Sequence, residues 1–304
     1  MKSITVTNEQ GFSMTFTEVF TDGFVLENAT GVQEAKADVI RTENAMGDGS
    51  IWNSSRMKER NIVLTLRDLP HADHRRNRAR LYRLFPIKSG GTLTYTDGAV
   101  TRVIPVYCES VTADPKKPSN SFTISLISPN PFFTDAEPTD VALAAWEGAF
   151  EWPAQAATPD TGEFEIDGAT LDTDVQEFGT RTEDLIVTCD NAGDVPCGFV
   201  LTFSASGTIT DPGILNVDTG EQLTLNLTLG AGDSVAVDTR FGHRTAVLTS
   251  GGVQYNVFRY ITAGSTFIQL PPGESHFTAT LGGSAATSAD LDISIRYETN
   301  YIGA

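Results

Sequence analysis

Apolar and polar residues alternate at a spacing of two along much of the chain. The clearest run is residues 62–67, where Ile62, Leu64 and Leu66 alternate with Val63, Thr65 and Arg67. Successive side chains of a strand point to opposite faces, so this alternation predicts strands with one buried face. In the first half the same pattern predicts strands at residues 4–6, 12–16, 24–26, 92–96, 100–107 and 122–126. In the second half it predicts short strands at residues 185–187, 199–203, 214–217, 223–229, 234–237, 246–248, 266–269, 277–281 and 291–297.

The sequence predicts two turns in the first half of the chain. Gly47-Asp48-Gly49-Ser50 predicts a tight turn, because glycine adopts positive φ at little cost. Asp97-Gly98 lies between two strand-like runs and predicts a hairpin with a type I′ turn. The strands and turns together predict a mainly β protein.

One helix interrupts this pattern, at residues 71–85. Asp68 is the expected N-terminal cap, Pro70 suits the first turn, and Pro86 ends the helix. The apolar stripe is short and consists of Leu81, Leu84 and Phe85. These three side chains are expected to face the core.

The N-terminal turns of this helix are strongly basic. Arg75, Arg76, Arg78 and Arg80 follow His74, and Asp73 is the only acid beside them. A solvated helix face is one interpretation, but such faces usually mix both signs of charge. The bias favours a contact surface for another copy of the chain or for a different protein partner, with a phosphate group as the alternative. Nucleic acid is disfavoured, because the whole chain is acidic and no aromatic residues interleave with the arginines.

Charge divides the chain into two parts. Residues 1–135 hold 16 basic and 15 acidic side chains, whereas residues 136–304 hold 5 basic and 24 acidic ones. Pro129-Asn130-Pro131 breaks the strand pattern just before this boundary. The sequence therefore predicts two domains, at residues 1–135 and 136–304. In the acidic stretch that opens the second, Trp146, Phe150 and Trp152 are the expected anchors.

Catalytic and metal motifs are absent from the sequence. His71 and His74 lie one helical turn apart, but the adjacent arginines would repel a cation. Asp172-Thr173-Asp174 lacks the glycine and the distal glutamate of a calcium loop. Glu163, Glu165 and Asp167 alternate, which places them on one strand face. Paired carboxylates can catalyse glycoside hydrolysis, but chance placement is favoured in a chain with 39 acidic residues. We expect neither an enzyme nor a cofactor or metal site.

Three cysteines give little redox information. Cys108 lies in a strand-like run, and Cys189 and Cys197 flank a turn across which they could face each other. A reducing cytosol would leave these two as thiols, so the thiol form is favoured over a disulfide.

A second basic cluster, Arg240 to Arg244, lies in the acidic half. The favoured interpretation is a turn whose cations offset nearby acids, and a sugar-binding surface is the alternative. No run approaches the about 20 apolar residues of a membrane span, and the first residues lack the apolar segment of a signal peptide. We therefore expect neither membrane insertion nor export.

Several segments, in order along the chain, resemble the distal tail proteins of siphophages. They are Gly47 to Ser55, the strand at residues 60–66 with the arginine-rich helix after it, Pro129 to Phe133, Asn191 to Pro196, Leu270 to Glu274 and Ile295 to Gly303. The likeness extends over nearly the whole chain.

The resemblance implies a fold and a function. Residues 1–135 would form a split β-barrel with one helix and a protruding hairpin, and residues 136–304 a galectin-like β-sandwich. The first domains would assemble into a hexameric ring at the virion tail tip, after synthesis in the host cytoplasm. That ring would join the tail tube protein to the hub or fibre protein, with a receptor-binding protein as a further candidate partner, and DNA would pass through its channel. The alternative function is a host carbohydrate-binding module in the second domain, although the galectin sugar-binding pattern is not present.

Overall fold

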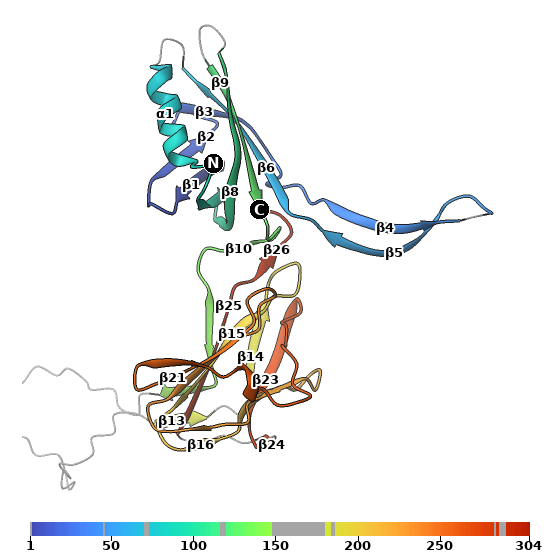
Figure 1. Cartoon of the computed structure of the whole chain (residues 1–304), viewed down its shortest axis with the longest axis vertical. Coiled ribbons are helices and arrows are strands. Elements are labelled where there is room, and N and C mark those ends of the chain that lie inside the picture. The colour runs from blue at the N-terminus through green and yellow to red at the C-terminus, as the bar shows by residue number, and fades with distance from the viewer. Residues whose placement is uncertain are drawn as a thin grey trace, which may run out of the picture.

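The computed structural model describes residues 2–44, 46–69, 73–115, 120–147, 180–183, 186–282, 284–285 and 290–304. The N-terminal and C-terminal halves form two separate bodies joined by a narrow connection (Figure 1). Predictions that concern His71, the acids at residues 163–174, Phe150, Trp152 and the side chain of Trp146 lie outside the described residues.

The N-terminal body is built on one large antiparallel sheet. Its strands follow the order β2-β1-β7-β8-β9-β6-β3, and two short strands, β10 and β26, join it beside β8. The strands are β1 (Lys2–Asn8), β2 (Ser13–Thr17), β3 (Phe24–Thr30), β6 (Arg60–Asp68), β7 (Gly90–Asp97), β8 (Val100–Pro115), β9 (Asn120–Ser128), β10 (Phe133–Asp135) and β26 (Asn300–Tyr301).

This sheet curls without closing. Its edge strands β2 and β3 approach each other through Phe16 and Phe24, whose ring centroids lie 6.1 Å apart in an edge-to-face contact. Phe24 in turn meets Phe122 of β9 at 5.7 Å. All three rings are fully buried, so apolar packing draws the two edges together while no hydrogen-bonded ladder joins them. The predicted split β-barrel is confirmed in this form.

Helix α1 (His74–Leu84) covers the interior of the curled sheet. The predicted stripe is confirmed, because Leu81, Leu84 and Phe85 are all buried. The predicted cap is wrong: Asp73 caps the helix by accepting a hydrogen bond from the Arg76 amide at 3.1 Å. Asp68 is buried at the end of β6 instead, and accepts from His74 Nδ1 at 2.5 Å and from the Asn120 amide at 2.6 Å.

The hairpin between β7 and β8 is confirmed, but its turn is displaced by one residue. Asp97 pairs with Val100, which leaves Gly98 and Ala99 as the two loop residues. Only Gly98 has a positive φ, of 64°, whereas a type I′ turn needs positive φ at both loop positions. The loop therefore has the φ pattern of a type II′ turn, with glycine at its first position.

A long ribbon extends away from the N-terminal body (Figure 1). It consists of β4 (Ala37–Glu43) and β5 (Ser50–Met57), which pair with each other and form a sheet of their own. We call residues 37–57 the arm. The arm is the protruding hairpin that the family resemblance implies, and the predicted turn at residues 47–50 lies at its tip.

The C-terminal body is a sandwich of two sheets. The first has the order β11-β25-β15-β20-β21-β22, and the second has the order β14-β23-β17-β18 with β24 beside β23. The strands of the first sheet are β11 (Thr139–Ala142), β15 (Phe199–Ala205), β20 (Ser234–Asp238), β21 (Thr245–Ser250), β22 (Val253–Asn256) and β25 (Leu291–Tyr297). Those of the second are β14 (Val187–Asn191), β17 (Pro212–Asn216), β18 (Gln222–Thr224), β23 (Gly273–Leu281) and β24 (Ser284–Ala285).

Two small sheets complete this body, β12 (Ala144–Glu147) with β13 (Thr180–Glu183) and β16 (Ile209–Thr210) with β19 (Thr228–Leu229). Its core includes Phe199, Phe203 and Phe277, whose side chains are fully buried between the two large sheets.

Most predicted strands of this half are confirmed, and the exceptions have local causes. Residues 266–269 form no strand, although Ile268 is buried as its apolar character suggests. Strand β22 was missed although Val253 and Tyr255 alternate with Gln254 and Asn256, and all four of its residues are exposed. A single 3₁₀ turn, η1 (Phe258–Tyr260), follows it.

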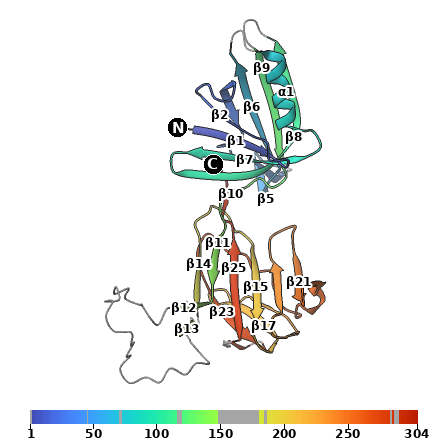
Figure 2. The ribbon, with the colours of Figure 1, turned by 90° about the vertical axis from the view of Figure 1, so that its left-hand side faces the viewer.

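Two chain segments connect the bodies: the one that leaves β10 and the one that returns to β26 (Figure 2). Arg102 of β8 pairs with Asp135 at 2.6 Å, and its guanidinium carbon lies 3.5 Å from the centroid of the Tyr301 ring. Thr299 also donates a hydrogen bond to Asp135. The end of the chain therefore pairs with the N-terminal sheet, although the predicted boundary at residue 135 assigns it to the second domain. The division into residues 1–135 and 136–304 stays a prediction.

Candidate subunit interface

The arginines of α1 form an exposed basic face. Arg75, Arg76 and Arg78 are exposed, and within the described part of the chain no carboxylate pairs with them. Arg76 also contributes its backbone amide to the Asp73 cap, which fixes the start of the helix. We call Arg75, Arg76 and Arg78 the arginine face.

Arg80 has a different role within the chain. Its Nη1 donates to the Asp22 carbonyl oxygen at 2.6 Å, in the turn between β2 and β3. That turn has positive φ at both Asp22 (55°) and Gly23 (96°), so it is a strained position that an added hydrogen bond helps to hold. Of the four predicted contact residues, Arg80 is therefore tied to an internal contact, and the other three point to solvent.

The arm presents apolar side chains to solvent on an isolated ribbon. Trp52 is 64% exposed and Ile51 60% exposed, and Val39 and Ile40 of the paired strand are exposed as well. A two-stranded hairpin alone is marginally stable in water. Ion pairs from Arg56 and Lys58 to Asp38 tie only its base. An exposed apolar surface on so thin an element indicates a protein contact.

A buried arginine fixes the base of the arm. Arg60 is only 6% exposed, and burial lowers the pKa of its guanidinium. The guanidinium donates to backbone carbonyls that lie far apart in the chain, namely Gly31 (2.7 Å), Glu34 (2.8 Å), Pro131 (2.6 Å) and Ile302. It also lies 5.0 Å from the centroid of the Phe133 ring. One side chain thus joins the segment before the arm, the strand after it and the end of the chain.

Gly31 is required at this junction. Its φ is +80°, and a Cβ atom there would lie 2.0 Å from the Asn61 carbonyl oxygen. Only glycine allows the chain to approach β6 so closely. Beside this junction a cavity of about 670 Å³ opens between the arm and the sheet, and its lining includes Lys36, Lys58, Glu59 and Glu109.

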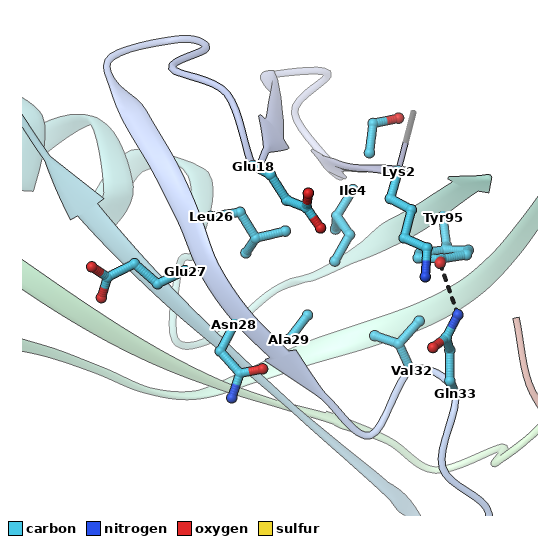
Figure 3. Close-up of a pocket in the computed structure, with 11 residues that line it drawn as sticks. Lys2, Ile4, Glu18, Leu26, Glu27, Asn28, Ala29, Val32, Gln33 and Tyr95 are labelled. Carbon is cyan, nitrogen blue, oxygen red and sulfur yellow. Dashed lines mark hydrogen bonds between the residues drawn. The ribbon is translucent and has the colours of Figure 1, made fainter. Parts of the chain in front are cut away.

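A second opening lies in the split between the sheet edges. It has a volume of about 190 Å³ and combines apolar side chains such as Ile4 and Val32 with the charged Lys2 and Glu18. Figure 3 shows these groups around the opening, with a 3.0 Å hydrogen bond from Gln33 Nε2 to the Tyr95 hydroxyl at one side. Among the described residues that line the opening, no hydrogen bond joins a nucleophile to a base.

The described residues lack a metal-binding cluster and a membrane-spanning helix. They contain no group of three or more histidine, cysteine or acidic side chains that could hold a metal ion. Within the same residues, no helix has the length and apolar character needed to cross a membrane.

The basic cluster of the C-terminal half is a turn, as the sequence predicts. Arg240 follows β20 and pairs with Asp238 through its Nε and Nη2 atoms, at 3.0 and 2.7 Å. Arg244 has a different partner: its guanidinium carbon lies 4.9 Å from the centroid of the Phe267 ring. Arg240 therefore offsets an acidic side chain, as predicted, whereas Arg244 does not.

The cysteines are thiols in the structure. Cys189 in β14 aligns with Ser275 and Cys197 bridges to Leu270, so the two do not face each other across a hairpin. Burial raises the pKa of each of these two thiols to about 12.

We expect both core thiols to resist modification in the folded protein, because the reactive species is the thiolate. In a Cys108→Ser variant at pH 8, a thiol reagent should label Cys189 and Cys197 at least about 100-fold more slowly than it labels the urea-unfolded chain. Rapid labelling of the native variant would show that these thiols are accessible and contradict their burial in the sandwich core.

Comparison with known proteins agrees with this architecture. Residues 192–301 match the family model described as "Siphovirus-type tail component, C-terminal domain". The crystal structure of the SPP1 Dit (gp 19.1) protein, described as a paradigm of the hub adsorption apparatus in phages that infect Gram-positive bacteria, superimposes with a TM-score of 0.67. It shares 13% sequence identity, over 98% of this chain and 98% of that one.

A chain of the phage P2 baseplate in its activated conformation with Ca gives a TM-score of 0.50 at 11% identity, over the whole of both chains. No curated protein sequence matches the chain.

Sequence reasoning placed the arginine face but missed the apolar surface of the arm and the role of Arg60. The adjacent apolar pair Ile51-Trp52 in a polar stretch was the available signal for the arm. The resemblance to the siphophage distal tail proteins is nevertheless confirmed: residues 192–301 match the family model of the siphovirus-type tail component C-terminal domain, and the chain shares the fold of SPP1 Dit.

Proposed function

We propose that the chain is a structural virion protein that forms a hexameric ring at the distal end of a long non-contractile phage tail. The ring would connect the tail tube protein to the hub or fibre protein, and DNA would pass through its channel. The family match and the fold support a tail component. The hexamer and these partners follow from the family resemblance, and no enzymatic activity is proposed.

The observation that carries this proposal is the position of two unlike surfaces. Helix α1, which carries the arginine face, lies on one flank of the N-terminal body, and the arm extends from the opposite flank (Figure 1). A contact between two different surfaces is heterologous, so each copy can bind the next head to tail. If the rotation between neighbours closes, such a contact produces a ring.

The chemistry of the two surfaces is complementary. Trp52 on the arm is an exposed aromatic side chain, and guanidinium groups stack on aromatic faces. Arg75 and Arg76 of the neighbouring copy would supply these groups, and their aliphatic stems would cover the rest of the Trp52 ring. Such a contact covers the Trp52 face of the arm and gives the arginine face a partner.

The C-terminal body would lie at the periphery of the ring. Residues 136–304 hold 24 acidic and 5 basic side chains, so neighbouring copies of this half repel one another unless salt screens them. The N-terminal half, with nearly balanced charge, carries the subunit contacts in this proposal. A receptor-binding protein is a further candidate partner for the peripheral surface.

Charge reversal on the arginine face tests this contact. Arg75→Glu with Arg76→Glu should reduce ring formation strongly, because it removes two cations and adds two acids at the same contact. Each exposed charge pair contributes less than about 1 kcal/mol, so two changes are made together. Mass photometry of the purified protein at low ionic strength measures the assembly.

Arg296→Glu is the matched control, since Arg296 is an exposed arginine in the other body. This control should assemble as the unmodified protein does, and circular dichroism should show that both variants are folded. A folded Arg75→Glu, Arg76→Glu variant that assembles normally would exclude the arginine face from the interface.

A further inference from the structure

A row of stacked side chains lies on the surface of the C-terminal body. The rings of Phe258 and Phe267 stack at 5.7 Å with an interplanar angle of 22°. The guanidinium carbon of Arg244 lies 4.9 Å from the Phe267 centroid and 6.0 Å from that of Phe241. We call Phe241, Arg244, Phe267 and Phe258 the aromatic row.

Most of the aromatic row is exposed, whereas Phe267 is half-buried against the core, and short-range hydrogen bonds hold the ends of the row. Phe241 is 88% exposed, and Phe258 and the nearby Tyr255 are exposed as well. The Phe258 amide donates to Asn256 Oδ1 at 3.0 Å, which fixes the start of η1. At the other end, the His243 amide donates to the Arg240 carbonyl at 3.1 Å and closes the turn that presents Phe241. The row therefore lies in the turn before β21, in η1 after β22 and in the loop before β23, with these backbone hydrogen bonds holding two of its segments.

Basic charge is concentrated at the same place. Residues 136–304 contain five basic side chains, and Arg240, Arg244 and Arg259 are three of them. Arg259 lies over the Tyr260 ring at 4.7 Å and donates to its hydroxyl at 2.7 Å. Arg240 is paired with Asp238, whereas the partners found for Arg244 among the described residues are aromatic rings. In a half this acidic, these arginines are a local concentration of positive charge beside the row.

We propose that the aromatic row binds an anionic glycan. The apolar C–H face of a sugar ring would lie on the exposed Phe241 ring, and the Arg244 guanidinium would bind a sulfate, phosphate or carboxylate group on the sugar. An acidic peptide would satisfy the guanidinium groups but leave the flat aromatic faces uncovered. An anionic sugar ring matches both features at once. This site acts independently of the ring contacts proposed above.

Binding of dextran sulfate and hyaluronate to the full-length protein, measured by biolayer interferometry at low ionic strength, tests this proposal. At least one of these anionic glycans should bind, while neutral dextran, polyphosphate and polyglutamate should each bind at least about tenfold more weakly. Phe241→Ala and Arg244→Gln should each weaken glycan binding about tenfold. Phe241 is so exposed that its removal should leave folding unchanged.

Arg296→Gln is the control, because Arg296 lies on β25, three strands away from β21 in the same sheet. It should change glycan binding less than about twofold. No binding to either anionic glycan would overturn the proposal. Equal binding to polyphosphate or polyglutamate would overturn it in favour of a site for charge alone or for acidic peptides, and so would glycan binding that Phe241→Ala leaves unchanged.

Discussion

Replacement of Arg60 by methionine should lower the free energy of unfolding of the N-terminal body by about 3–5 kcal/mol. Methionine fills similar space but donates no hydrogen bond, so the carbonyl oxygens of Gly31, Glu34, Pro131 and Ile302 lose their shared donor. Urea unfolding followed by circular dichroism measures the change. Arg60→Lys should also be destabilising, because a single ammonium group cannot reach carbonyls on several sides.

Arg67→Met is the matched control for this effect. Arg67 lies on the same strand, but its side chain is about half exposed and pairs with Glu27 at 3.0 Å. An exposed ion pair contributes less than about 1 kcal/mol, so this variant should unfold nearly as the unmodified protein does. Equal, small effects of Arg60→Met and Arg67→Met would show that Arg60 does not hold the base of the arm.

Replacement of Ile51 and Trp52 by serine should abolish stable ring formation while leaving each subunit folded. Aromatic residues at the centre of an interface often contribute about 2 kcal/mol or more, and 2 kcal/mol corresponds to roughly 30-fold in affinity for each contact. Both side chains are exposed in the single subunit, so their removal costs the isolated fold little. Mass photometry should show single subunits where the unmodified protein forms rings.

Hydrogen exchange of the unmodified protein and of the Ile51→Ser, Trp52→Ser variant tests whether the lost arm contact causes the loss of rings. In single subunits the amides of β4 and β5 should exchange rapidly, because an isolated ribbon opens readily. In the ring they should be protected. Val217→Ser, which replaces an exposed apolar residue of the C-terminal body, is the control and should not change assembly. Rings of normal stability in the Ile51→Ser, Trp52→Ser variant would exclude the arm from the subunit contact.

The helix illustrates what local sequence pattern can and cannot predict. The spacing of Leu81, Leu84 and Phe85 was sufficient to place its buried face. The cap was wrong because Asp68 and Asp73 are both plausible by residue type. The tertiary structure distinguishes them, because β9 brings the Asn120 amide to Asp68, which accepts a hydrogen bond there and does not cap the helix.

Local sequence patterns could not predict the contacts of Arg60 or the strands of the arm, for a different reason. The acceptors of Arg60 lie 26 to 242 residues away in sequence, so no local window contains them. The arm has exposed residues on both faces, which removes the alternation that marks a strand packed on a core. Its existence followed from the family resemblance, and its apolar surface only from the structure. The arginine face could be proposed from sequence because a bias in charge does not depend on tertiary contacts.

The central claim is that this chain assembles head to tail into a ring through the arm and the arginine face. Negative-stain electron microscopy of the purified protein at high concentration and low ionic strength tests it most directly. The account predicts closed rings of six copies with a central hole and the C-terminal bodies around the outside. Single subunits alone, or pairs related by a two-fold axis, would contradict it.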